Sequence, residues 1–213
     1  FFISNEAMRY NRYKGEMVSG ADALRHSMRE TKELTAISIL NNAVNPLAPM
    51  GDGKPLLSLD HPLSYGGSYA NTLPIQTDLN ETSLEALVMQ AARFRDQAGK
   101  LAIAKPRKLI GGVGNMFAIE RLVKSNFRVG SNFNDVNVVH GMFPEGYAIN
   151  HYLSTQNSFF VLTDVDGLKM YQSEEPIVHQ TTCEDTRSIK HTAFESYCFG
   201  CDNPRAIVGC IIP

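Results

Sequence analysis

The chain has 213 residues, of which 43% are hydrophobic and 20% are charged, which is the composition of a globular protein. Lys and Arg number 20 and Asp and Glu number 22, so the net charge of -2 argues against a dedicated nucleic-acid binder. This net charge still permits loose contact with nucleic acid. No apolar run reaches the roughly 18 residues that a bilayer requires, so we expect no membrane association.

The sequence begins on the apolar stretch Phe1-Phe2-Ile3. This stretch lacks the positive segment with which a signal peptide starts, so it does not predict secretion. We expect an upstream segment that this sequence does not include.

The N-terminal third predicts two helices. Ser4 can cap a short helix that runs to about Tyr13, and Gly15 and Gly20 predict a break after it. From residue 21 to about 44 the chain lacks Gly and Pro, which predicts a helix about 36 Å long. Its first half is almost wholly polar, so we expect this half to bridge or to lie against other chains.

The middle of the chain changes character twice. Residues 45–80 are rich in Gly and Pro and predict no helix, and a run of this length usually serves a function or an interface. Thr82-Ser83-Leu84-Glu85 is a capping box and predicts an amphipathic helix that Gly99 stops. A strand over 107–110 and a helix over 115–125 then predict an α/β core.

The C-terminal part predicts strands after a loop over residues 126–146. Strands over 158–163 and 168–171 flank Asp164-Val165-Asp166-Gly167, where Asp-Gly suits a hairpin turn. A long strand over 188–199 and a final strand over 206–212 follow.

Two motifs resemble binding sites. Cys198-Phe-Gly-Cys201 has the spacing of half a zinc site, but the second half is absent because Cys183 and Cys210 stand alone. Without a secretory signal, all four are expected to be reduced thiols. The run Gly111–Gly114 lies between a strand and a helix, but it lacks the third glycine of a dinucleotide-binding loop and the Lys of a phosphate loop. It predicts a tight turn.

The remaining candidates are weaker. Asp164–Gly167 resembles the start of a calcium loop whose other ligands are missing. Glu174-Glu175 precedes Pro176 and predicts a solvated pair in a loop or at a sheet edge. A catalytic set assembled in space stays open, but no local signature supports one. We therefore assign no catalytic, cofactor-binding or metal-binding residues and expect no cofactor. The six histidines are scattered at His26, His61, His140, His151, His179 and His191.

A series of short segments resembles, in order, the major head subunits of Mu-like tailed bacteriophages. Each segment is a weak motif, but their order and spacing are specific and cover nearly the whole chain. The segments are Met28–Glu33, Ile39–Val44, Gly51–Pro55, Asp60–Leu63, Ala104–Ile110, Phe143–Tyr147, Asn150–Leu153, Phe159–Asp164, Gly167–Lys169, Tyr197–Asp202 and Arg205–Gly209.

The resemblance implies an α+β chain with the HK-ninety-seven-type capsid fold of tailed phages. Residues 1–48 and 166–213 would form the peripheral domain, with a spine helix over about 21–44 and long strands, the last of which could join the other domain. Residues 49–165 would form the axial domain, and residues 126–146 part of the capsomer centre. The N-terminal arm and extended loop of this fold would lie upstream of Phe1, so no crosslinking residue can be assigned.

The resemblance also implies a structural protein, not an enzyme. Copies of the chain would form pentamers and hexamers of an icosahedral head around double-stranded DNA, in a virion assembled in the bacterial cytoplasm. A portal and a scaffold or maturation protease would be further partners. Two alternatives stay open: a compartment shell of the encapsulin type, and a small α/β enzyme with an anion site at Gly111–Gly114.

Overall fold

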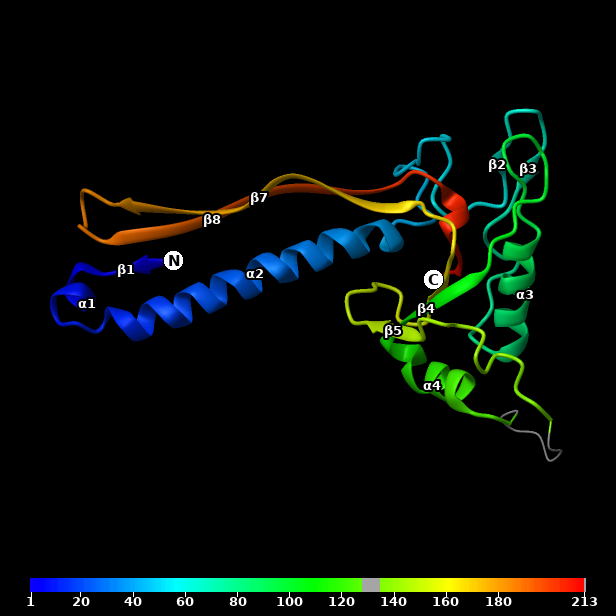
Figure 1. Ribbon diagram of the computed structural model, residues 1–213, viewed down its shortest axis with the longest axis horizontal. Helices are drawn as coiled ribbons and strands as arrows, with labels where there is room; N and C mark the ends of the chain where they lie inside the picture. Colours follow the sequence, from blue (N-terminus) through cyan, green and yellow to red (C-terminus); the bar gives the residue numbers. More distant parts are fainter. Residues whose placement is uncertain (128–134, 213) are drawn as a thin grey trace. The chain divides into compact units, whose positions relative to one another are not determined.

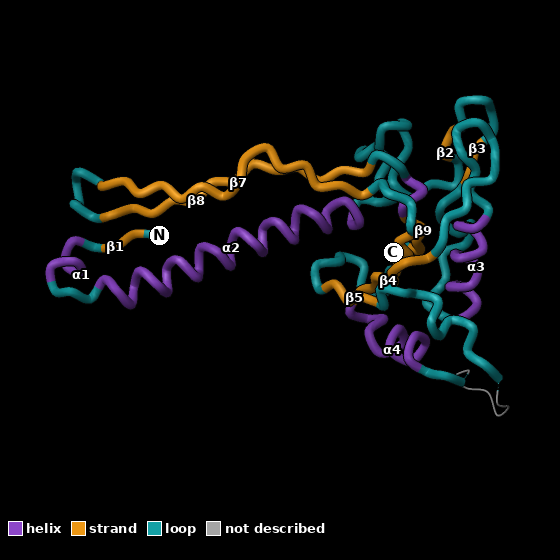
Figure 2. Tube along the Cα trace, viewed as in Figure 1, coloured by secondary structure: helices purple, strands orange, loops and turns teal. Residues whose placement is uncertain are grey.

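The structure is a computed structural model that describes residues 1–127 and 135–212. The chain divides into two compact units (Figures 1 and 2). Unit 1 comprises Phe1–Ala36 and Met170–Gly200, and unit 2 comprises Ile37–Lys169 and Cys201–Pro213. Both units mix helices with strands, as the α+β prediction requires.

Unit 1 consists of a long helix beside a three-stranded sheet of order β1-β8-β7 (Figure 1). Strand β1 pairs antiparallel with β8, so that Phe2 lies opposite Lys190. The predicted cap at Ser4 is confirmed, because its side chain accepts a hydrogen bond from the Ala7 amide at 3.1 Å. The elements are β1 (Phe2–Ile3), α1 (Asn5–Arg9), α2 (Tyr13–Asn41), β7 (Leu168–Thr182) and β8 (Ile189–Cys201), of which the last residues of α2 and the ends of the two long strands belong to unit 2.

Helix α2 begins earlier than predicted. The expected break at Gly15 and Gly20 is wrong, because the helix runs from Tyr13 through both glycines. A glycine inside a helix costs only about 1 kcal/mol relative to Ala, which neighbouring residues can offset. At Gly20 the missing side chain is used, since a Cβ there would lie 2.6 Å from the ring of Phe1.

Strand β7 is much longer than predicted. Only its first residues, 168–171, show a strand pattern, yet it continues to Thr182. The segment that contains Glu174, Glu175 and Pro176 forms the edge strand of the sheet. Proline is tolerated at an edge because its missing N–H leaves no partner unsatisfied there.

Unit 2 is built on a four-stranded sheet of order β5-β4-β6-β9. Strands β4 and β5 are parallel, and the other neighbours are antiparallel. The predicted strand over 107–110, helix over 115–125 and final strand are confirmed as β4, α4 and β9. The elements of unit 2 are β2 (His61–Pro62), β3 (Ser68–Tyr69), α3 (Glu81–Ala92), β4 (Pro106–Gly112), η1 (Val113–Asn115), α4 (Met116–Lys124), β5 (Tyr147–Asn150), β6 (Phe159–Thr163), η2 (Pro204–Ala206) and β9 (Ile207–Cys210).

Each face of this sheet carries its own hydrophobic core. Phe159 and Phe160 are neighbours on β6 and both are fully buried, because successive side chains of a strand point to opposite faces. Phe159 belongs to the core that contains Leu84 of α3 and Ile119 of α4. Phe160 belongs to a second core with Leu40 from the end of α2 and with Leu56 and Leu57.

Two local predictions are wrong. The capping box of α3 lies at Asn80 and Ser83 instead of beginning at Thr82, and the helix ends at Ala92 instead of reaching Gly99. The Asp164–Gly167 segment is not a hairpin turn, because β6 and β7 belong to different sheets. At Gly167 a Cβ would lie 2.3 Å from the carbonyl oxygen of Asn203, so the glycine allows two backbone segments to approach.

The two predicted loops differ in how much of them the structure describes. Residues 45–80 contain no helix, as predicted, and form only the short strands β2 and β3. Leu56, Leu57 and Asn71 are buried, so this run packs against the rest of unit 2. The predicted loop over 126–146 falls in part on residues 128–134, which lie outside the described residues.

Candidate assembly surface

Unit 1 has almost no core of its own. Within it only Ile3, Ala7, Ser188 and His191 are buried. Every residue of β7 from Met170 to Thr182 is exposed. A small unit is stable only if it removes a large share of its apolar surface from water, so this surface calls for further contacts.

A groove of about 490 Å³ separates α2 from the sheet within unit 1. On the helix side it is lined by Met17, Leu24 and Met28, whose spacing places them on one face of α2. On the sheet side it is lined by Val178 and Ala193. The groove is therefore apolar on both walls.

An ion pair closes one end of this groove. Lys32 Nζ lies 2.6 Å from Glu195 Oε2 and 5.0 Å from the ring centroid of Tyr197. The Glu195 side chain is only 8% exposed, so the pair joins α2 to β8 in a largely water-free position. It connects the polar half of α2 to the sheet.

The opposite face of the same sheet is largely polar, but it exposes two large apolar side chains. Pro176 and Val178 line the groove, so Ile177 between them projects from the other face. By the same alternation Phe194 projects there, between Ala193 and Glu195. Ile177 is 46% exposed and Phe194 is 56% exposed, which makes this face a candidate contact surface for another polypeptide.

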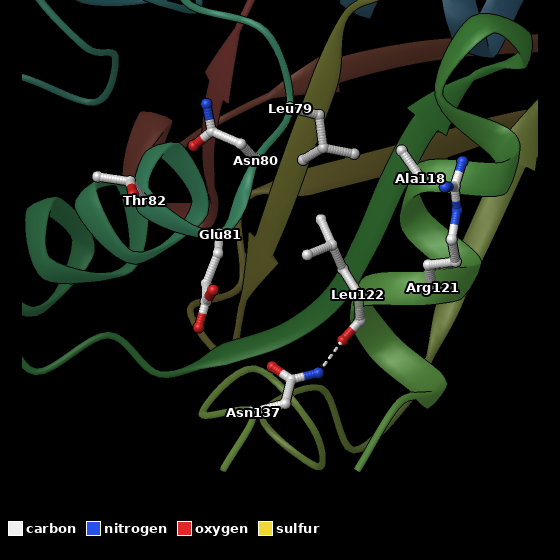
Figure 3. A pocket seen from close by; sticks show the side chains of 8 residues that line it. All are labelled: Leu79, Asn80, Glu81, Thr82, Ala118, Arg121, Leu122 and Asn137. Atoms are coloured by element: carbon white, nitrogen blue, oxygen red, sulfur yellow. Dashed lines mark hydrogen bonds between the residues drawn. The ribbon is translucent and has the colours of Figure 1, made fainter. Parts of the chain in front are cut away.

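A pocket of about 390 Å³ in unit 2 lies between the start of α3 and helix α4 (Figure 3). Its polar groups serve the chain itself. Asn80 caps α3, and Asn137 Nδ2 donates hydrogen bonds to the carbonyl oxygens of Leu122 and Ser125. Arg121 Nε donates to the carbonyl oxygen of Phe117. These groups hold helix ends in place and form no catalytic arrangement.

The glycine run after β4 is packed against the chain. The amides of Gly112 and Gly114 donate to the carbonyl oxygens of Ser158 and Gln156. A Cβ at Gly112 would lie 2.2 Å from the Gln156 carbonyl oxygen. An anion site would need these amides to be free, so the geometry is that of a tight turn.

The Cys198-x-x-Cys201 spacing lies within a strand. Residues three apart in a strand point to opposite faces, so the two thiols do not converge. Burial raises the pKa of Cys201 to about 11 and also raises the pKa of Cys210, which keeps both thiols protonated. Among residues 1–127 and 135–212, no three His, Cys, Asp or Glu side chains are grouped to hold a metal ion.

The carboxylates of the calcium-like segment also diverge. Asp164 Oδ1 accepts from the Lys105 amide at 2.8 Å, whereas Asp166 lies 3.7 Å from Lys169. Glu174 and Glu175 are exposed on β7. In the part of the chain that is described, no helix is long and apolar enough to cross a membrane.

The sequence patterns did not predict one polar cluster, which lies around His61. His61 is fully buried and contacts Asp52 and Asn71, one at each ring nitrogen. The partners come from a Gly/Pro-rich run without periodicity, so no spacing rule indicates them. Both ring nitrogens already have a hydrogen-bond partner, so neither is free to accept a proton from a nucleophile.

The chain has an α+β fold of the HK-ninety-seven type, which two solved structures share. A virus-like particle from Pyrococcus furiosus matches with a TM-score of 0.55 and 13% identity, over 99% of this chain and 72% of that chain. A chain of Mycobacterium phage Che8 matches with a TM-score of 0.50 and 11% identity, over 98% of this chain and 67% of that chain. No protein-family model and no curated protein matches the sequence.

Proposed function

We propose that this chain is the major capsid subunit of a Mu-like tailed bacteriophage, and that it acts by self-assembly and not by catalysis. Pentamers and hexamers would tile an icosahedral head around double-stranded DNA. The observation that carries the proposal is unit 1, in which a long helix lies beside a hairpin whose strand β7 is exposed on both faces (Figure 1).

In this proposal unit 1 is the body of the peripheral domain and unit 2 that of the axial domain. The uncovered residues of α2, β7 and β8 would be buried by neighbouring subunits in the lattice. Obligate interfaces bury about 2,000 Å² or more in total, which exposed strands of this length can supply when several neighbours contribute. The chain would reside in the virion after assembly in the bacterial cytoplasm, with a portal and a scaffold or maturation protease as partners.

The test is direct visualisation of assembly. The full-length protein is expressed and examined by negative-stain electron microscopy and by sedimentation. Shells, capsomers or tubes are expected. A monomer that persists at high concentration would contradict the proposal.

The second candidate is a compartment shell that encloses proteins instead of DNA. The similarity to a virus-like particle favours it as much as it favours a phage head. Purified particles from the native host distinguish the two: nuclease-protected DNA is expected for a phage head, and a protein cargo for a compartment. The enzyme alternative at Gly111–Gly114 has lost its support, because the amides of Gly112 and Gly114 are already bonded.

A further inference from the structure

His61 is a fully buried histidine held between two side chains in unit 2. Its Nδ1 lies 2.6 Å from Asp52 Oδ2, and its Nε2 lies 3.1 Å from Asn71 Oδ1. The number of protons on this imidazole depends on whether each ring nitrogen donates or accepts in its contact.

The orientation of the Asn71 amide is decided by its other contacts. Asn71 Nδ2 donates to the carbonyl oxygens of Leu56 at 2.7 Å and of Pro204 at 3.1 Å. Asn71 Oδ1 accepts from the Ser58 amide at 2.9 Å. Rotating the amide by half a turn would place oxygen against two carbonyls and nitrogen against an N–H, so only one orientation is possible.

With Asn71 Oδ1 fixed as an acceptor, Nε2 of His61 must carry a proton. A neutral imidazole would then present the bare lone pair of Nδ1 to the Asp52 carboxylate at 2.6 Å, which is a repulsive contact. We propose that His61 and Asp52 hold a proton between them, with His61 as an imidazolium, and that this proton latches Asp52, His61 and Asn71 together within the 45–80 segment. The proposal concerns the single subunit and does not depend on assembly.

The neighbouring groups leave the Asp52 carboxylate to the imidazole. The imidazole stacks on Tyr69, with ring centroids 5.0 Å apart, and burial raises the pKa of Tyr69 to about 12, so the ring stays uncharged. Arg205 also lies over the Tyr69 ring, but it donates its hydrogen bonds to Arg95 and Asn203, which leaves Asp52 to His61. The ionisable groups around the imidazole are Asp52, Lys54, Asp60, Tyr69 and Arg205.

The latch joins three parts of the 45–80 segment, and Asn71 connects them to the rest of unit 2. Asn71 contacts Leu56, Ser58 and His61 within the Gly/Pro-rich run, and Pro204 beside β9. Replacing Asp52 by Asn would remove the charge from its contact with His61. The charged hydrogen bond is then lost, and we expect local opening to become roughly tenfold to hundredfold more frequent.

Nitrogen-15 NMR of histidine-labelled, full-length protein tests where the proton lies. Solid-state spectra serve whether the chain is free or assembled, so this experiment is independent of the proposed shell. At neutral pH both ring nitrogens of His61 are expected to be protonated. An unprotonated nitrogen on His61 in the folded protein would overturn the proposal.

Two matched variants sharpen the test. In Asp52→Asn the new amide can donate to Nδ1, so His61 is expected to carry only one proton. Asp166→Asn changes an exposed carboxylate and is expected to leave both protons in place. If Asp52→Asn keeps both nitrogens protonated, Asp52 does not hold the proton and the latch is wrong.

Hydrogen exchange tests the latch itself. The amides of Ser58 and Asn71 bond across the latch, to the Asn71 side chain and to the Ser58 carbonyl. Their protection factors are expected to be about tenfold to hundredfold lower in Asp52→Asn than in the native chain, while that of Val161 in β6 stays constant. In Asp166→Asn they are expected to stay as in the native chain. Equal protection at Ser58 and Asn71 in Asp52→Asn and in the native chain would overturn the latch.

Discussion

Lys32 of α2 and Glu195 of β8 form an ion pair, with Nζ and Oε2 2.6 Å apart, inside the otherwise apolar groove of unit 1. The Glu195 side chain is 8% exposed and that of Lys32 28% exposed, so the pair is shielded from solvent more on the glutamate side. A shielded carboxylate is costly without its partner, because it has lost hydration and gains no counter-charge.

We expect Lys32→Met to destabilise unit 1 more than the double variant Lys32→Met with Glu195→Leu. The single change leaves a carboxylate without its counter-ion, which costs up to about 3 kcal/mol at a partly exposed site, whereas the double change leaves an apolar pair. Urea denaturation of the three proteins measures this. The control is Lys54→Met, whose partner Asp60 is well exposed, and there we expect little or no loss of stability. Equal losses in single and double variants would contradict the expectation.

Phe194→Ser separates folding from assembly. Phe194 projects from the uncovered sheet face and is 56% exposed, so its loss is expected to change the free energy of unfolding by about 0.5 kcal/mol or less. Assembly is expected to weaken, because an apolar contact between subunits is lost. Light scattering and electron microscopy report assembly, and urea denaturation reports stability.

The matched core variant is Phe160→Ala. Phe160 of β6 is fully buried against Leu56 and Leu57. We expect its replacement to lower the free energy of unfolding by about 3–5 kcal/mol. If Phe194→Ser is as destabilising as Phe160→Ala, the outer face of the sheet is part of a core and not a contact surface.

Gly112→Ala is expected to impair the folding of unit 2. Its Cβ would lie 2.2 Å from the backbone oxygen of Gln156, and backbone cannot move aside as a flexible side chain can. We expect a cost of about 1–3 kcal/mol and a lower melting temperature. Gly51→Ala is the control, because a Cβ there meets nothing within 4 Å and no change or a small gain is expected. A normal melting temperature for Gly112→Ala would show that the turn relaxes.

The cysteines should react with thiol reagents in a definite order. Cys198 is exposed, whereas Cys201 and Cys210 are buried. Burial raises the pKa of Cys201 to about 11, so this thiol stays protonated and unreactive until the pH approaches that value. At pH 8 we expect Cys198 to be labelled quickly and Cys201 and Cys210 only after unfolding in urea. Mass spectrometry of the labelled peptides checks this. Rapid labelling of Cys201 in the folded chain would contradict its burial.

Local sequence patterns predicted the elements that carry a clear apolar periodicity. Helix α4 and strand β4 carry apolar residues at the helical and strand periods, and each was predicted within two residues of its ends. Strand β7 was missed beyond residue 171, because a strand exposed on both faces has no alternating pattern to detect. The helix break predicted at Gly20 was wrong for another reason. The ring of Phe1 lies against this glycine, and the sequence does not show that contact.

The sequence alone determined the fold class. The ordered segments that resemble phage head subunits implied the fold that the comparisons show, whereas the polar helix and the Gly/Pro-rich run did not predict it by themselves. Only the tertiary structure decided which surfaces are left uncovered and which buried groups meet. The ion pair of Lys32 with Glu195 and the cluster around His61 join residues that no periodicity relates. Such contacts depend on how the chain packs in three dimensions, where a buried polar group must find a partner wherever the fold brings one.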